Sequence, residues 1–436
     1  MFEDSGYKGS VRRILEGAKV QIGDIIRIVK DGHVYEGNLI PRSEFGDEKC
    51  VVIKLKSGYN IGVRVDGKTK IFKIKEGEKP AFIPPPPPET KPELKCVAII
   101  STGGTIASRV DYRTGGVRPA LTASDLYSVV PELSEIASVE AEILFSILSE
   151  NMTPERWSVI AETVARKIKS GVSGVVVPHG TDTMAYTAAA LSFALQNLPV
   201  PVILVGSQRS SDRPSSDAAL NLIGAVRAAV DAPFAEVAIA MHETTSDESI
   251  VIHRGTKVRK CHTSARYAFR SINASPLAKV KNGEVIMLTD DYRRRGESEL
   301  VLKKNFEDRV ALIKFYPGFN PQIIDFLVDE GYRGVVLEGT GLGHIGAYCF
   351  KAVKRAIDND LMVAMTSQCL WGRVNMNVYD TGRDLIKMGV LPLKDMLPET
   401  ALVKMMWVLG QTSDLEEAKA LLLRNLAYEF SPRTLP

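Results

Sequence analysis

Two short stretches of this sequence combine glycines with side-chain hydroxyl groups, and each follows a run of apolar residues. The first is residues 101–105, Ser-Thr-Gly-Gly-Thr, after residues 97–100. The second is residues 179–183, His-Gly-Thr-Asp-Thr, after residues 174–178. Short apolar runs rich in β-branched residues are typical of buried strands. Because open α/β sheets hold their sites at the carboxyl ends of strands, we expect the two stretches to form one hydroxyl-centred site.

A threonine hydroxyl is a weak nucleophile until a base or a neighbouring cation activates it. Asp182, beside Thr181, is one candidate, and a lysine that is desolvated or relays a proton with Asp182 is another. The residues alone leave open which of the many lysines this is. Taken by itself, the first stretch also fits a glycine-rich turn whose threonine caps a helix, and it is the second stretch that favours a site.

The composition is that of an ordinary globular protein with several domains. The chain has 436 residues, 45% of them hydrophobic and 25% charged, with a formal net charge of +3. Such a length exceeds what one hydrophobic core supports. No apolar run approaches the roughly 18 residues of a membrane helix, and the acidic, polar start does not resemble a signal peptide. Five scattered cysteines fit reduced thiols. We therefore expect a cytoplasmic protein without a membrane span.

The first 83 residues predict a small β-barrel. Five short apolar runs are separated by turn signals that include Asp31-Gly32 and Asp66-Gly67, and Asp-Gly is a strong hairpin signal. A mild excess of positive charge allows contact with RNA, although docking or stabilisation is the simpler role. Residues 84–94, which begin with five prolines, predict an extended linker, because such a run joins neither helix nor sheet.

The rest of the chain predicts an α/β fold with two domains, residues 95–300 and 301–436. Apolar strand patterns alternate with helical patterns, among them a buried helix over residues 184–196, and this succession favours a doubly wound, mostly parallel sheet. Residues 291–308 are charged and poor in strand patterns. They are therefore predicted to be an interdomain segment.

No nucleotide or metal site is expected in this chain. Residues 341–346 fit the glycine pattern of dinucleotide-binding loops, but the next predicted strand ends in Ser367-Gln368, without the acidic residue that holds a ribose. The phosphate-binding pattern of ATP-using enzymes is missing, and so are the paired-cysteine and paired-histidine patterns of zinc sites. We therefore predict no cofactor and no metal.

Residues 102–107 and 179–183 together resemble the two signatures of the L-asparaginase/glutaminase family, over residues 95–436. The resemblance implies that Thr105 is the nucleophile and that Tyr112, in a mobile lid, activates it. Thr181, Asp182 and a lysine would form a second, relay triad. By its spacing to residues 269–273 the lysine matches Lys260.

The same resemblance implies a substrate site, and Lys257 is an alternative to Lys260 as the relay lysine. Ser149 would bind the α-carboxylate of the substrate, and Glu150 and Asp182 its α-amino group. Gly104 would complete the substrate contacts. Glu150 stands where the family commonly has glutamine.

The barrel, the proline linker and residues 207–213 together are similar to the D-subunit family of archaeal glutamyl-tRNA(Gln) amidotransferases. The resemblance implies glutamine hydrolysis through a threonine acyl-enzyme. Ammonia would pass to a GatE-type partner, which uses ATP and Mg to convert Glu-tRNA(Gln) to Gln-tRNA(Gln). It also implies a homodimer within a heterotetramer, with tRNA(Gln) bound mainly by the partner. A free-standing cytoplasmic L-asparaginase and an inactive, RNA-binding scaffold are the alternatives.

Overall fold

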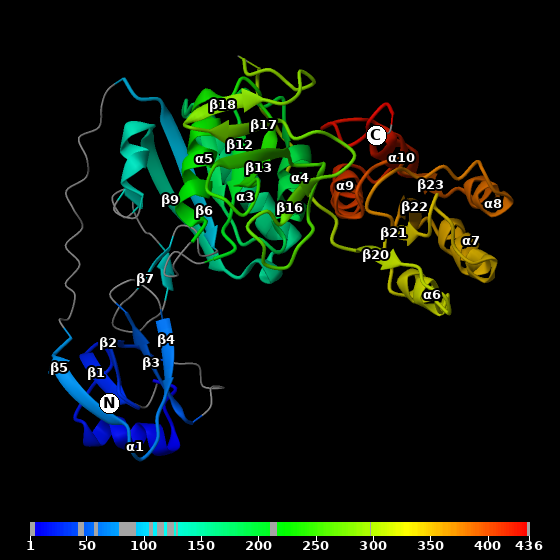
Figure 1. Ribbon diagram of the computed structural model, residues 1–436. Helices are drawn as coiled ribbons and strands as arrows, with labels where there is room; N and C mark the ends of the chain where they lie inside the picture. Colours follow the sequence, from blue (N-terminus) through cyan, green and yellow to red (C-terminus); the bar gives the residue numbers. More distant parts are fainter. Residues whose placement is uncertain are drawn as a thin grey trace.

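The computed structural model describes most of the chain, in three successive parts that are coloured along the sequence in Figure 1. The described residues are 5–41, 48–55, 60–77, 93–103, 108–110, 117–119, 126–127, 130–209, 216–296 and 298–433. Three predicted site residues, Gly104, Thr105 and Tyr112, lie outside them, and so does most of the predicted proline linker.

The first part is the small β-rich unit that the sequence predicts. Its sheet has the order β4-β3-β2-β1-β5, and the pairs along it are antiparallel. A helix that was not predicted, α1, contributes the buried Val11 and Leu15 to the core of the unit. The elements are α1 (Gly9–Gly17), β1 (Ile25–Lys30), β2 (His33–Leu39), β3 (Cys50–Lys54), β4 (Asn60–Arg64) and β5 (Lys70–Lys75).

The second part is built on an eight-stranded mixed sheet with the order β18-β17-β14-β13-β12-β10-β6-β9. The five strands from β13 to β9 are parallel, and β14, β17 and β18 continue the sheet antiparallel. The doubly wound, mostly parallel sheet is thus confirmed. The strands are β6 (Cys96–Gly103), β9 (Ser138–Ile147), β10 (Gly174–Pro178), β12 (Val202–Val205), β13 (Val237–His242), β14 (Ser249–Arg254), β17 (Ala278–Lys281) and β18 (Glu284–Met287).

Helices cover both faces of this sheet, which explains the continuous apolar runs of its strands. Successive residues of a strand point to opposite faces. In β6, Val97 and Ile99 pack with α5 (Ala218–Asp231), whereas Ala98 and Ile100 pack with α3 (Pro154–Lys169) and α4 (Met184–Ala194). The central strands are therefore buried on both sides, as parallel strands generally are.

The helix predicted over residues 184–196 is shorter than expected. It ends at Ala194, and β11 (Leu195–Gln196) pairs antiparallel with β19 (Val301–Leu302). The charged segment before β19 packs on the second part of the chain, because the guanidinium of Arg295 donates hydrogen bonds to the carbonyl oxygens of Val230 and Ala229. The two residues after α4 are therefore in a short strand that pairs with residues 301–302, and they do not continue the helix.

The third part is the predicted smaller α/β unit, with an all-parallel sheet in the order β20-β21-β22-β23. It shares a core with the second part, in which Trp157 and Phe193 pack among residues of α9 such as Trp407. Its elements are β20 (Val310–Lys314), α6 (Gln322–Asp329), β21 (Gly334–Gly339), η3 (Ala347–Cys349), α7 (Phe350–Asp358), β22 (Met362–Ser367), α8 (Asp380–Met388), β23 (Leu391–Pro392), α9 (Pro398–Gln411) and α10 (Leu415–Leu423).

Six further short elements complete the description of these residues. They are β7 (Ser108–Val110), β8 (Val117–Pro119), η1 (Pro131–Glu135), η2 (Ser149–Asn151), β15 (Val258–Lys260) and β16 (Phe269–Ser271). Among the helices of the described residues, none is long and apolar enough to cross a membrane.

Candidate active site

The described residues of the first stretch, 101–103, lie beside the strand that leads into the second stretch, because β6 and β10 are parallel neighbours in the eight-stranded sheet. The side chain of Thr102, at the end of β6, is buried, and its hydroxyl donates a hydrogen bond of 3.0 Å to the carbonyl oxygen of Pro178 at the end of β10. The carboxyl end of β6 is thereby fixed against the carboxyl end of β10, which residues 179–183 follow.

Gly103 allows β6 to approach its other neighbour, β9, more closely than any other residue would. It has a φ of +120°, and a Cβ atom added there would lie 2.2 Å from the carbonyl oxygen of Ile147. Side chains rarely adopt such a backbone conformation, and the contact excludes them sterically. The glycine thus brings the end of β9, and the residues that follow it, to the same edge of the sheet.

Those following residues form η2 (Ser149–Asn151), which carries two of the predicted substrate contacts. Ser149 is buried, and its carbonyl oxygen accepts a hydrogen bond of 2.7 Å from the hydroxyl of Thr183. A Cβ atom on Gly180 would lie 2.8 Å from the Cβ atom of Ser149, so only glycine fits beneath this serine. Glu150 is exposed on the same turn.

Lys260 reaches the second stretch from a separate two-stranded hairpin, β15 and β16, in which it pairs with Phe269. Its ammonium group donates to the hydroxyl oxygen of Thr181 at 2.8 Å and to the carboxylate of Asp182 at 2.7 Å. The side chain of Lys260 is 13% exposed and that of Asp182 is 69% exposed. A mostly covered ammonium group therefore faces a hydroxyl and a carboxylate at the rim of the site.

His179, the first residue of the second stretch, holds this stretch in place through two hydrogen bonds of its ring. Its Nδ1 lies 2.7 Å from the carbonyl oxygen of Gly180, so Nδ1 carries the proton, and Nε2 accepts from the hydroxyl of Thr187 at 2.9 Å. Trp157 donates its indole N–H to the same hydroxyl. Burial lowers the pKa of His179 from 6.5 to about 4, although its bond to Gly180 opposes the shift. The ring is thus a neutral support at neutral pH.

The structure brings together Thr181, Asp182 and Lys260, and it places Ser149 beside them through Gly180. Lys257, the alternative relay lysine, points elsewhere: its buried ammonium group pairs with the carboxylate of Asp395 at 2.7 Å. The geometry therefore favours Lys260 over Lys257 for contact with the second stretch.

Sequence reasoning missed the supporting contacts made by three residues of the two stretches. Thr102, His179 and Thr183 enter it only as members of a pattern, yet each fixes a neighbouring segment. Only their place at the end of a buried strand could have signalled this. Another glycine-rich stretch, residues 341–346, forms a tight turn in which Thr340 pairs with His344. Within the described ranges, no group of three or more histidine, cysteine or acidic side chains is arranged to hold a metal ion.

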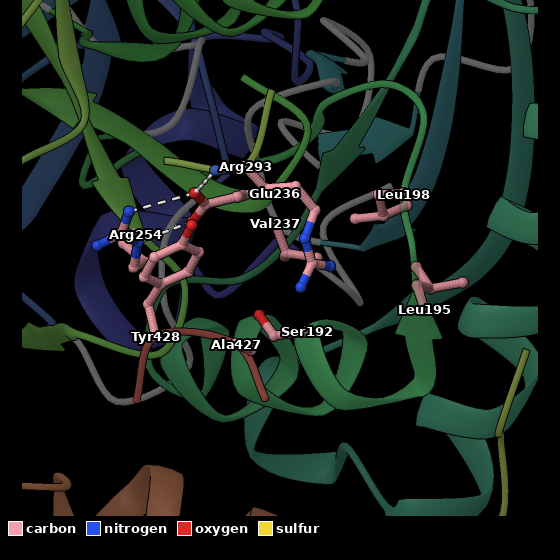
Figure 2. Close-up of a pocket in the computed structure, with 9 residues that line it drawn as sticks. All are labelled: Ser192, Leu195, Leu198, Glu236, Val237, Arg254, Arg293, Ala427 and Tyr428. Atoms are coloured by element: carbon pink, nitrogen blue, oxygen red, sulfur yellow. Dashed lines mark hydrogen bonds and ion pairs between the residues drawn. The ribbon is translucent and has the colours of Figure 1, made fainter. Parts of the chain in front are cut away.

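A pocket lined by residues of the second and third parts lies at the opposite end of the strands of the eight-stranded sheet (Figure 2). It is lined in part by Val237, the first residue of β13, and by the ion pair of Arg254 with Glu236 at 2.7 Å. The guanidinium of Arg254 also lies 4.1 Å from the centre of the Tyr428 ring. Because β13 is parallel to β6 and β10, this pocket is at the amino ends of the strands and is separate from the candidate site.

The two-domain α/β fold and the hydroxyl-carboxylate-ammonium cluster at its strand ends define an asparaginase-type enzyme. Residues 96–293 match the family model Asparaginase, N-terminal, and residues 309–422 match the Glutaminase/Asparaginase C-terminal domain. Residues 20–74 match the GatD N-terminal domain. With these three matches and the relatives described next, the chain belongs to the family of glutamyl-tRNA(Gln) amidotransferase D subunits.

The relatives resemble the chain over nearly its whole length. The glutamyl-tRNA(Gln) amidotransferase D subunit of Pyrococcus furiosus is 53% identical over 98% of both chains. That of Metallosphaera sedula is 53% identical over 98% of this chain and 97% of its own. Among solved structures, the thermostable L-asparaginase from Thermococcus kodakarensis is 34% identical with a TM-score of 0.70, covering 77% of this chain and 99% of its own.

Proposed function

We propose that this chain is the glutaminase subunit of a tRNA-dependent amidotransferase. The observation that best supports a hydrolytic activity is that the Lys260 ammonium group lies within hydrogen-bond reach of both Thr181 and Asp182. Membership of the D-subunit family supports glutamine as the substrate.

The proposed reaction is acyl transfer through a threonine ester. The hydroxyl oxygen of Thr105 attacks the side-chain amide carbon of glutamine, the C–N bond breaks, and the hydroxyl proton leaves with the nitrogen as ammonia. Water then attacks the ester, which releases glutamate and restores the hydroxyl. Tyr112 activates Thr105 in the first step. Lys260, with Thr181 and Asp182, stabilises the charge and relays the proton, because an ammonium group that is mostly covered acts strongly on a nearby oxyanion.

In this proposal the side chains near the carboxyl ends of the strands bind the substrate. Ser149 binds the α-carboxylate of glutamine, and Gly104 completes the substrate contacts. Glu150 and Asp182 bind the α-amino group, because two exposed carboxylates favour a cation. The neutral support of His179 keeps the turn in place during turnover.

Ammonia then serves a partner. In this proposal a GatE-type partner binds tRNA(Gln), uses ATP and Mg to activate the glutamate on it, and receives the ammonia. The chain forms a homodimer within a heterotetramer in the cytoplasm and needs no cofactor of its own. The names of the relatives support an amidotransferase complex.

Substitution of the nucleophile tests this function. Thr105→Val keeps the side-chain shape and removes the oxygen, so glutamine hydrolysis should be abolished. The assembled complex supplied with ammonium chloride should still amidate Glu-tRNA(Gln), because the second reaction needs only ammonia. Thr244→Val, at an exposed position, is the matched control and should leave both reactions unchanged. Glutaminase activity that survives in Thr105→Val would overturn the assignment.

A free-standing L-asparaginase is the second candidate, because the similar solved structures are L-asparaginases. Rapid hydrolysis of asparagine by the intact chain without any partner would favour it. The amidotransferase predicts instead slow hydrolysis by the isolated chain and stimulation by a tRNA-charged partner.

A further inference from the structure

The hairpin that presents Lys260 is attached at its base to the third part of the chain. The base is formed by residues 256–257 and 272–273, where the backbone N–H of Ile272 donates to the carbonyl oxygen of Lys257. In the third part, the hydroxyl of Thr400 in α9 donates to the carbonyl oxygen of Thr256 at 3.0 Å. The amide of Asn273 donates to the carbonyl oxygen of Gly372 at 2.8 Å.

A buried ion pair stands at the centre of this attachment. The ammonium group of Lys257 lies 2.7 Å from the carboxylate of Asp395, and the two side chains are 1% and 0% exposed. The asparagine at the base, Asn273, also donates to the backbone carbonyl oxygen of Asp395 at 3.3 Å. A pair so completely removed from water is costly unless its geometry and further hydrogen bonds compensate. The ion pair therefore fixes both the distance and the orientation of the Lys257 side chain relative to Asp395.

The compensating bonds come from the last described residues of the chain. The backbone N–H of Ser431 donates to both carboxylate oxygens of Asp395, at 3.0 and 3.2 Å. Four residues earlier, the carbonyl oxygen of Ala427 accepts from the hydroxyl of Thr256 at 2.8 Å. Between them, Glu429 is paired with Lys404 of α9, and both side chains are fully buried. The C-terminal segment, residues 425–431, thus joins the hairpin base to the third part.

We infer that Lys257 and Asp395, held by Ser431, are positioning residues for Lys260. Lys257 immediately precedes the three-residue strand β15, and Lys260 ends it. A movement at the base is transmitted along so short a strand to the contacts with Thr181 and Asp182. Because those contacts are hydrogen bonds of 2.7 to 2.8 Å, a displacement of about 1 Å would break them. This inference rests on the proposed function, in which Lys260 is the relay lysine.

A double-mutant cycle with Lys260 tests the inference in the assembled complex. If Lys257 acts through Lys260, Lys257→Met should lower kcat/KM for glutamine by at least ~10-fold in the wild-type background and by less than about twofold in the Lys260→Met background. A role in folding alone predicts the same factor in both backgrounds, and that result would overturn the inference. Lys281→Met, at the end of β17 and with a side chain that is 43% exposed, is the control and should change neither.

The double variant Lys257→Met/Asp395→Leu keeps the test valid if Lys257→Met does not fold. Apolar side chains of similar volume often replace a buried ion pair without loss of stability, but they give Ser431 no acceptor. This variant should therefore fold and still lose at least ~10-fold in kcat/KM. Full activity in the folded double variant would show that the pair does not position Lys260.

A second measurement reads the surroundings of Lys260 without any activity. Brief treatment of the full chain with acetic anhydride, followed by peptide mass spectrometry, measures the acetylation rate of each lysine. Lys260 should react at least about threefold faster in the double variant than in the wild type, because an ammonium group released from Asp182 is more accessible. An unchanged rate would overturn the inference. If the wild-type complex does not hydrolyse glutamine but the acetylation rate changes as expected, the proposed function fails and the positioning role stands.

Discussion

The ammonium nitrogen of Lys260 lies 2.8 Å from the hydroxyl oxygen of Thr181, although the two residues are 79 positions apart in the sequence. The same ammonium group also contacts the neighbouring Asp182. Lys260 lies in the strand β15, whereas Thr181 and Asp182 lie in the turn after β10. Such a long-range contact is maintained only if the sheet, the hairpin and the turn all hold their places. The predictions below test these supports one at a time.

Removal of the Lys260 ammonium group should nearly abolish hydrolysis. Lys260→Met keeps most of the side-chain volume but leaves Thr181 and Asp182 without their cation. Groups that act as a unit lose most of their effect together, so kcat should fall by at least ~10³-fold with the fold intact. Steady-state kinetics and circular dichroism measure the two quantities. A loss of less than about tenfold would contradict a role in the relay.

Gly180 should tolerate no side chain. In Gly180→Ala the new methyl group would lie 2.8 Å from the Cβ atom of Ser149, whose backbone Thr183 holds in place. Displacement of Ser149 should raise KM for glutamine by about tenfold or more, since a lost charge-assisted hydrogen bond costs roughly 1.5–3 kcal/mol. Gly296→Ala is the control, because a Cβ atom there meets nothing within 4 Å. Equal KM values in the two variants would show that Ser149 does not bind substrate.

Stability should decrease at mildly acidic pH through His179. The unfolded chain binds a proton at this residue near pH 6.5, whereas burial lowers the pKa in the folded chain to about 4. The unfolded state therefore binds more protons between these values, and the free energy of unfolding falls as the pH falls from about 6.5 to about 4. The loss is on the order of 3 kcal/mol.

Urea unfolding at about pH 7.5 and about pH 4.5, followed by tryptophan fluorescence, measures this difference. His179→Gln should decrease the change between the two pH values, whereas His33→Gln, at an exposed histidine, should leave it unaltered. Part of the change will persist in His179→Gln, because burial also lowers the pKa of His253, to about 3. The same change in wild type and in His179→Gln would contradict the neutral state of His179.

Deletion of residues 1–90 should weaken assembly with the partner or stimulation by it, while the remaining chain stays folded. The solved L-asparaginase of Thermococcus kodakarensis matches 77% of this chain over 99% of its own length, and on this basis we expect the α/β parts to fold without the β-rich unit. Size-exclusion chromatography with the GatE-type partner and the partner-stimulated glutaminase rate measure the effect. Full stimulation of the shortened chain would assign the β-rich unit another role.

The sequence predicted those parts of the fold that depend on local patterns. Residues 97–100 form a continuous apolar run that predicts a buried strand, and in the structure Val97 and Ile99 pack on one face of the sheet while Ala98 and Ile100 pack on the other. The strand-end position of Thr181 and Asp182 followed from the same reasoning. By contrast, α1 was missed, because a short segment that starts at Gly9 and ends at Gly17 has weak helical propensity and is stabilised by packing on the sheet.

The rest of the site depends on contacts between segments that are far apart in the sequence. Lys260 is singled out by resemblance, since no local pattern distinguishes it from Lys257 three residues earlier. The structure separates the two by what each meets: Lys257 meets Asp395 in the core, and Lys260 meets Asp182 at the rim. Glycine patterns likewise marked Gly103 and Gly180 as special, but only the approach of Ile147 and Ser149 explains why.

The contact between Ser431 and Asp395 also determines at which stage of synthesis the attachment of the hairpin can form. Ribosomes synthesise a chain from its N-terminus, and domains fold in that order. The turn after β10 and the hairpin with Lys260 are made first, whereas Ser431, which completes their attachment, follows only after the strands β20 to β23 of the third part. A nascent chain therefore lacks this attachment until Ser431 has been added. If the attachment positions Lys260, as inferred above, the lysine takes its place in the site only after the third part of the chain has been made.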